Sequence, residues 1–150
     1  MASFGIHLAI AKKYLESHPE ENVEDFVQGT LDVDLAEDRI ASHYQSVTDN
    51  SNLIAFLNGK VGISNYAKEH SINSSYDRGY FLHLLTDYYF YTEFFDKEWL
   101  SSISYGEFKK VVYHDYGSIN RHLLREYNIE YPEIVRQYNI NEEDASIIIL

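Results

Sequence analysis

The stretch that decides the fold spans residues 78–90 and reads RGYFLHLLTDYYF. Aromatic and leucine residues continue to Phe95 with no glycine or proline after Gly79, and Ser74 with Asp77 forms a capping box just before the stretch. This pattern predicts a helix of about 20 residues, roughly 75–95, that is hydrophobic nearly all round. We therefore expect it to be the buried central helix of its domain.

His83 and Asp87 are polar residues inside this largely apolar stretch. They are four positions apart, so on a helix they lie on the same face. A buried aspartate costs several kcal/mol unless it is paired or bound to a metal. The pair alone leaves two interpretations open, a core histidine hydrogen-bonded to Asp87 or two ligands of one metal ion, and the other candidate ligands must decide between them.

The remainder of the chain favours a single all-α domain over residues 1–150. A chain of this length can bury a proper core, and its two prolines and seven glycines suit helices better than a turn-rich sheet. Residues in the 60s are polar and give no clear signal. Before the central helix, the sequence predicts a helix over 4–15, a helix from the N-cap Asn22 to Gly29, a turn over 30–34, a loop or short helix over 39–44 and a helix over 51–59. After it, Ser104 and Glu107 form a capping box for a helix over 104–114, which is broken at Gly117-Ser118. Further helices are predicted over 119–127, 132–138 and 141–150.

The charge and composition exclude several classes of function. A formal net charge of −12 argues against stable nucleic-acid binding and against docking on an anionic membrane. Two or three divalent cations would cancel about a third to a half of that charge. No segment has the pattern of a signal peptide or a membrane span, so we expect a cytoplasmic protein. The chain has no cysteine, so a metal would be held by His, Asp, Glu or main-chain groups.

Histidine and carboxylate residues on inward-facing or loop positions supply such ligands. Imidazole and carboxylate together suit Zn²⁺, and also non-haem Fe²⁺ or Mn²⁺. His18 and His70 stand in polar surroundings and are interpreted as surface histidines, and the arginines beside His122 also indicate a solvated face. The candidate ligands are His7, Asp34, His43, His83, Asp87, His114, Asp115, His122 and Glu126, the last two again four positions apart.

Four segments, in this order, resemble the bacterial zinc-dependent phospholipase C family, which is related to fungal single-strand-specific zinc nucleases. The resemblance spans about residues 4–127. Val33 stands where the family pattern has proline. The four segments are IHLAIA at 6–11, FVQGTLDVD at 26–34, SHY at 42–44 and GYFLHLLTD at 79–87.

The resemblance implies an all-helical fold with one to three zinc ions that hydrolyses phosphate esters. By position, Asp34, His43, His83 and Asp87 would hold one metal, and His7 would join Asp87 on another. A third metal in the family uses a further histidine and an H-x-x-x-E pair. His122 and Glu126 have that form, with His114 or Glu93 as the further ligand.

The leading hypothesis is thus a metal-dependent phosphoesterase, in which Asp34 orients the attacking water as a base. Its substrate would be a small phosphate ester, a phospholipid headgroup or a nucleotide. One alternative is an HD-type phosphohydrolase, in which His114-Asp115 acts with His43 or His83 and a distant aspartate. The other alternative is a non-enzymatic helical protein with a structural or vestigial metal site.

Overall fold

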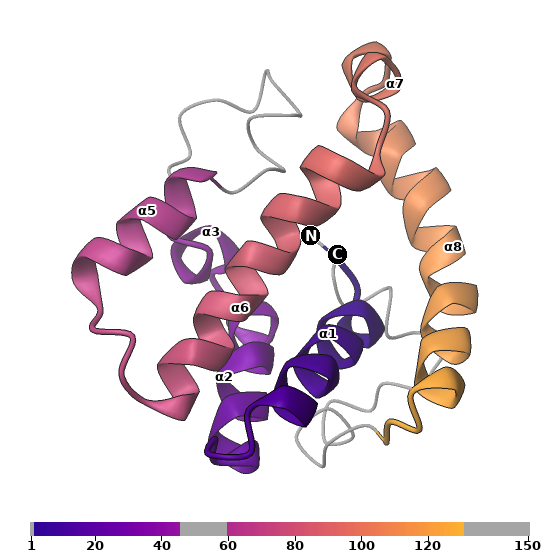
Figure 1. Cartoon of the computed structure of the whole chain (residues 1–150). Helices are drawn as coiled ribbons and strands as arrows, with labels where there is room; N and C mark the ends of the chain where they lie inside the picture. The colour runs from indigo at the N-terminus through magenta and orange to yellow at the C-terminus, as the bar shows by residue number, and fades with distance from the viewer. Residues whose placement is uncertain (1, 46–59, 131–150) are drawn as a thin grey trace.

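The computed structural model describes residues 2–45 and 60–130, and every regular element in those ranges is a helix. The all-α prediction is therefore confirmed for the described residues (Figure 1). The helices are α1 (Phe4–Ser17), α2 (Val23–Leu35), α3 (Arg39–Ser42), α5 (Lys60–Glu69), α6 (Ser75–Tyr89), the π-helical turn η1 (Phe90–Phe94), α7 (Lys97–Ser102) and α8 (Tyr105–Glu126). In the described parts of the chain, no helix is both long and apolar enough to cross a membrane.

Helices α2 and α6 pack against each other more extensively than any other described pair. Two glycines make this close approach possible. A Cβ atom on Gly29 would lie 2.1 Å from the carbonyl oxygen of Tyr76, and one on Gly79 would lie 2.0 Å from that of Phe26. The two backbones therefore touch, and side chains just beyond the crossing can reach the carbonyl groups of the partner helix.

The helix starts follow the expected local chemistry. Ser74 with Asp77 caps α6 and Ser104 with Glu107 caps α8, each as a complete capping box. Asn22 caps α2 by accepting a hydrogen bond from the backbone N–H of Asp25. These three predicted caps are confirmed.

Two predicted helix ends are wrong. The second helix does not end at Gly29 but continues to Leu35, so the segment 30–34 is helical rather than a turn. Helix α8 likewise passes through 117–118 without a break. A glycine inside a helix costs about 1 kcal/mol, and at Gly29 the close packing against α6 outweighs that cost. Residues 60–69, which carry no clear sequence signal, form α5. The helices predicted over 51–59, 132–138 and 141–150 lie outside the described residues.

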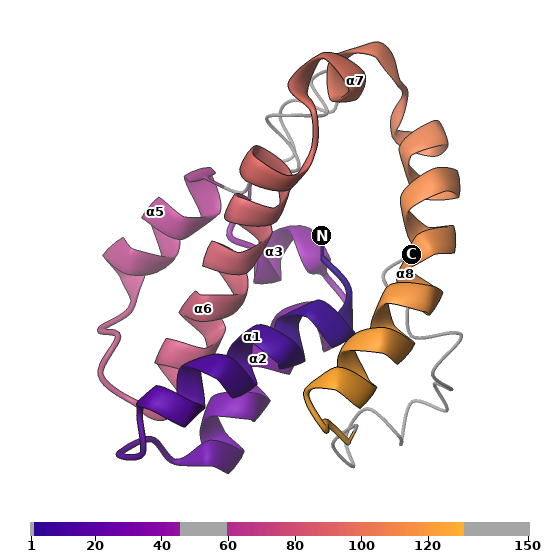
Figure 2. The ribbon, with the colours of Figure 1, turned by 45° about the vertical axis from the view of Figure 1, so that its right-hand side comes forward.

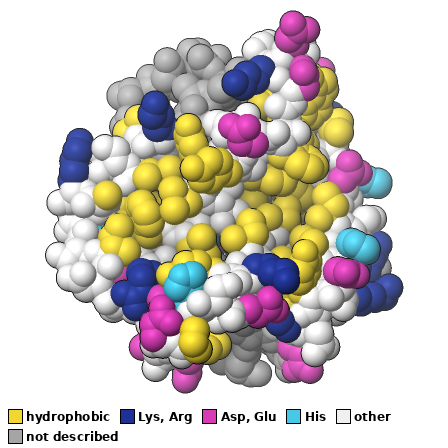
Figure 3. Space-filling model, viewed as in Figure 1, with side chains coloured by type: hydrophobic (Ala, Val, Ile, Leu, Met, Phe, Trp, Pro, Cys, Tyr) yellow, Lys and Arg dark blue, Asp and Glu magenta, His cyan; other side chains and the backbone are white. Residues whose placement is uncertain are grey.

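The central helix is buried on one face only, which corrects the expectation of burial all round. The buried positions of α6 include Gly79, His83 and Asp87. By contrast Tyr89 is 58% exposed and Phe94 in η1 is 67% exposed. Figure 3 shows apolar side chains gathered on this side of the molecule, where a groove between α1 and the α6–η1 segment is lined by residues including Ile10, Leu82, Leu85, Tyr89 and Phe94.

Apolar clusters hold the helices together. Phe4, Leu8, Leu31 and Leu124 join α1, α2 and α8. A larger cluster that includes Phe108 and Tyr116 connects α8 to the start of α1 and to η1, and Figure 2 shows α8 along one side of the molecule. Among the core residues of the described chain, a group of histidines and aspartates stands out as polar.

Candidate metal centre

Helix α6 supplies the first two members of the polar group. His83 and Asp87 point the same way from consecutive turns, with Nε2 of His83 3.6 Å from Oδ2 of Asp87. His83 is 1% exposed and Asp87 is 3% exposed. The predicted shared face of this pair is therefore present and turned into the protein.

Helix α1 adds His7 to the same group. The imidazole rings of His7 and His83 are stacked, with centroids 3.6 Å apart and planes 9° from parallel. Nε2 of His7 lies 3.5 Å from Oδ1 of Asp87 and 4.0 Å from Oδ2 of Asp34. Two stacked imidazoles disfavour a double positive charge, so this arrangement favours at least one neutral ring.

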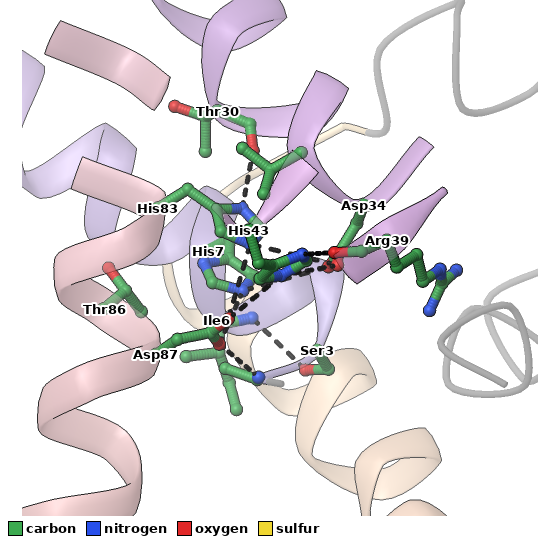
Figure 4. Close-up of polar contacts among 12 residues, drawn as sticks. Ser3, Ile6, His7, Thr30, Asp34, Arg39, His43, His83, Thr86 and Asp87 are labelled. Carbon is green, nitrogen blue, oxygen red and sulfur yellow. Dashed lines mark hydrogen bonds and ion pairs between the residues drawn. The ribbon is translucent and has the colours of Figure 1, made fainter. Parts of the chain in front are cut away.

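Asp34 and His43 close the group from α2 and from the end of α3. Nε2 of His43 lies 3.6 Å from Oδ1 of Asp34 and 3.3 Å from Oδ2 of Asp87. Nε2 of His83 lies 3.9 Å from the same oxygen of Asp34. Figure 4 shows the three imidazoles meeting the two carboxylates.

Backbone carbonyl groups fix two of the three imidazoles. Nδ1 of His83 lies 2.7 Å from the carbonyl oxygen of Thr30, and Nδ1 of His43 lies 2.7 Å from that of Arg39. A carbonyl oxygen can only accept, so Nδ1 is the donor in both rings. In its neutral form each ring therefore presents the lone pair of Nε2 to the centre, as a metal-ligating histidine does.

Most of the inward-facing polar atoms of this group lack a hydrogen-bond partner in the part of the chain that the structure describes. Asp87 is the exception, because its Oδ1 accepts from the backbone N–H of Ala2 at 2.6 Å. Buried polar groups are normally hydrogen-bonded, so a buried set without partners indicates a missing ligand or ion. The atoms without a partner are Nε2 of His7, His43 and His83, Nδ1 of His7, and both carboxylate oxygens of Asp34.

The histidines and aspartates of the group shift one another's pKa values. Burial lowers the pKa of His7, and the neighbouring His83 lowers it further. Burial alone would lower the pKa of His83, but Asp34 and Asp87 outweigh it and raise that pKa. Burial alone would raise the pKa of Asp87, yet the interactions it receives, including those of the three imidazoles, hold its pKa well below the usual range. The carboxylate of Asp87 thus stays charged, beside a His7 ring whose neutral form is favoured and a His83 ring whose protonated form is favoured.

The spacing of the donor atoms fits a transition-metal site. Atoms bound to one tetrahedral zinc ion at about 2.0–2.2 Å lie roughly 3.3–3.6 Å from one another. The contacts between imidazole nitrogen and carboxylate oxygen here run from 3.3 Å to 4.0 Å. Two ligand triads are close enough to hold an ion, namely His7 with His83 and Asp87, and Asp34 with His43 and His83.

The other predicted ligands lie elsewhere. His114 and Asp115 are side by side on the solvent face of α8, with side chains 86% and 64% exposed. His122, Glu126 and Glu93 are exposed as well. None of these residues belongs to a ligand group among the described residues, so the structure does not join them to the buried centre.

Several groups that shape the site carried no sequence signal. The carbonyl groups of Thr30 and Arg39 orient two histidines, and the N–H of Ala2 holds Asp87. Every residue has a carbonyl group, so the sequence does not mark these two. They reach the histidines because α2 crosses α6 and because α3 is a short turn.

No family model, curated protein or solved structure matches the chain.

Proposed function

We propose that this protein is a metal-dependent hydrolase of phosphate esters with a two-ion centre, zinc being the first candidate. One observation carries the proposal. Asp34 and Asp87 each turn one oxygen toward His43 and His83 and the other toward His7. Carboxylates that face two ways suit two adjacent ion positions.

The donors divide unequally between two positions. His43, His83, Oδ1 of Asp34 and Oδ2 of Asp87 offer four donors to one position. His7 and Oδ1 of Asp87 offer two donors to the other, and Oδ2 of Asp34 lies beside it, 4.0 Å from Nε2 of His7. Structural zinc sites have four protein ligands, whereas catalytic sites keep one position open. We assign the catalytic role to the position beside His7.

The donor set also fits the proposed chemistry. Nitrogen and oxygen donors without thiolate suit Zn²⁺, with Fe²⁺ and Mn²⁺ as alternatives. A pair of such ions lowers the pKa of water and neutralises the charge of a phosphate group. Two divalent ions would change the formal charge of the chain from −12 to −8, which makes an anionic substrate easier to accept.

Asp34 is the proposed base. It is 1% exposed, and neither of its carboxylate oxygens has a hydrogen-bond partner among the described residues. Oδ2, the oxygen beside His7, can therefore accept the proton of an attacking water, while Oδ1 stays with the imidazoles of His43 and His83. The resemblance to the zinc-dependent phospholipase C family agrees with this role and stays a prediction.

A structural metal centre is the second candidate, because the five residues of the group are only 1–3% exposed. A site that turns over a phosphate ester must admit it, whereas a structural ion needs no access. The two candidates share their ligands and differ in activity.

The test is hydrolysis of bis(p-nitrophenyl) phosphate by protein loaded with zinc or manganese. We expect turnover that disappears with a chelator and falls at least about 100-fold in Asp34→Asn, within the range of a lost general base. The control is His18→Ala, which removes a histidine stacked on Tyr14, outside the site. Bound metal without turnover would support the structural centre and overturn the hydrolase.

A further inference from the structure

His43 is held differently from the other four residues of the centre. His7, Asp34, His83 and Asp87 lie within α1, α2 and α6, each longer than twelve residues. His43 lies at the C-terminal end of α3, which has four residues. So short a helix does not hold a side chain in place by itself, and neighbouring groups must do so.

The backbone immediately after His43 is strained. Tyr44 has a φ angle of 53°, in the left-handed region that residues with a Cβ rarely adopt. Strained residues of this kind persist where the surrounding structure fixes them, and they cluster at functional sites. Tyr44 is thus a residue whose conformation depends on its contacts.

Helix α5 supplies those contacts. Nδ2 of Asn65 donates a hydrogen bond to the carbonyl oxygen of Tyr44 at 3.1 Å. A Cβ atom on Gly62 would lie 2.0 Å from the carbonyl oxygen of His43, so the two backbones touch there. The hydroxyl oxygen of Tyr44 lies 2.6 Å from Nε2 of His70, just past the end of α5, and the two share a hydrogen bond.

Aromatic packing completes the contact between α5 and the end of α3. The ring of Tyr66 is stacked on His70 at 4.4 Å and on Tyr80 at 4.8 Å, and it meets Tyr44 edge-on at 5.1 Å. Tyr80 also donates a hydrogen bond to the carbonyl oxygen of Ser42 at 2.5 Å. The residues on both sides of His43 are therefore tied to α5 and α6.

We propose that Tyr44 and His70 are positioning residues that hold the imidazole of His43 at the metal centre. The inference rests on the proposed metal centre. Their shared hydrogen bond fixes the strained turn at Tyr44, and this turn fixes the direction of the His43 side chain. The ion bound by His43 therefore depends on α5, whereas the ion beside His7 does not.

The test is a zinc titration that resolves two binding constants, with Co²⁺ absorbance as a second readout of coordination. Wild type should bind two ions. Tyr44→Phe and His70→Ala should each weaken the binding of one ion by about 10-fold or more, as the loss of an orienting partner does. The binding constant of the other ion should stay unchanged. His70→Gln, whose amide can donate to the Tyr44 hydroxyl, should restore much of the lost affinity.

His18→Ala is the matched control, because His18 is also stacked on a tyrosine, Tyr14, at 3.8 Å. His18→Ala should leave both zinc binding constants unchanged. All titrations are made under conditions in which circular dichroism shows every variant to be folded. A wild type that binds no metal would overturn the metal centre and the positioning role together. Two ions bound equally well by wild type and His70→Ala would overturn the positioning role alone.

Discussion

Nε2 of His43 lies 3.3 Å from Oδ2 of Asp87, and this contact joins the end of the four-residue helix α3 to the last turn of α6. Both residues are buried, so the hydration that their polar atoms lose on folding must be replaced by other interactions. Within residues 2–45 and 60–130, each of the three imidazole Nε2 atoms lacks a hydrogen-bond partner, so no ordinary hydrogen bond joins the imidazole nitrogens to the carboxylates. The proposed divalent ion between them would supply the missing interaction.

The first prediction concerns His83→Ala and Asp87→Ala. Each change removes a ligand of the centre, so metal binding free energy that also stabilises the fold is lost. A chelator should lower the Tm of the metal-loaded wild type by several degrees and leave the Tm of both variants unchanged. Differential scanning calorimetry with and without the chelator measures this.

The matched control for these variants is Leu84→Ala on the same helix, 3% exposed and not a ligand. It should destabilise the protein by about 2–5 kcal/mol, as a large-to-small change in a core does, yet keep its response to the chelator. An equal chelator response in His83→Ala and in wild type would show that the histidine is only a packing residue.

The second prediction concerns the crossing of α2 and α6. In Gly79→Ala the new Cβ atom would lie 2.0 Å from the carbonyl oxygen of Phe26, so the helices must separate. We expect a loss of about 1–3 kcal/mol in the free energy of unfolding. Gly106→Ala, where nothing lies within 4 Å of the new atom, should instead stabilise α8 by up to about 1 kcal/mol. Urea unfolding measures both, and equal effects would contradict the close crossing.

The third prediction concerns the pH dependence of stability through Glu21. Hydrogen bonds from Arg78 are the main cause that lowers the pKa of Glu21 to about 2 from its ordinary value of 4.5. Because the folded pKa is the lower one, this stabilisation is complete above about pH 4.5 and is lost as the pH falls toward 2. Wild type should therefore lose more stability than Glu21→Gln between pH 5 and pH 2. A pH-independent difference between the two would refute this assignment.

The fourth prediction concerns His122 on the exposed face of α8. We expect His122→Ala to keep the metal content and the phosphodiesterase activity of wild type, because no third ligand joins His122 and Glu126 among the described residues. Elemental analysis and the activity assay decide it. Loss of one ion per chain together with activity would add a third metal to the centre.

Local sequence signals predicted the parts of the fold that local chemistry controls. Hydroxyl and carboxylate residues three positions apart marked the starts of α6 and α8, and the spacing of His83 and Asp87 placed both on one face. The i, i+4 spacing of His122 and Glu126 is the same, but it does not say which face is buried. Helix α8 buries Phe108, Val112, Tyr116, Asn120 and Leu124, which turns the pair outward.

The glycines show why other parts could not be predicted. Gly29 resembles a helix end because glycine favours that position, yet it lies inside α2, where the absence of a side chain permits contact with α6. The strained turn at Tyr44 and the carbonyl group of Thr30 have no sequence signal at all. Such features depend on contacts between segments far apart in the chain.

Native mass spectrometry of the full chain after exposure to zinc tests the central claim most directly, because it counts the ions bound to each molecule. The account predicts two zinc ions on wild type and fewer on Asp87→Ala, since that carboxylate faces both positions. The spectrum of Leu84→Ala should match that of wild type. A wild-type chain that carries no zinc, or an Asp87→Ala chain that carries the same two ions, would contradict the claim.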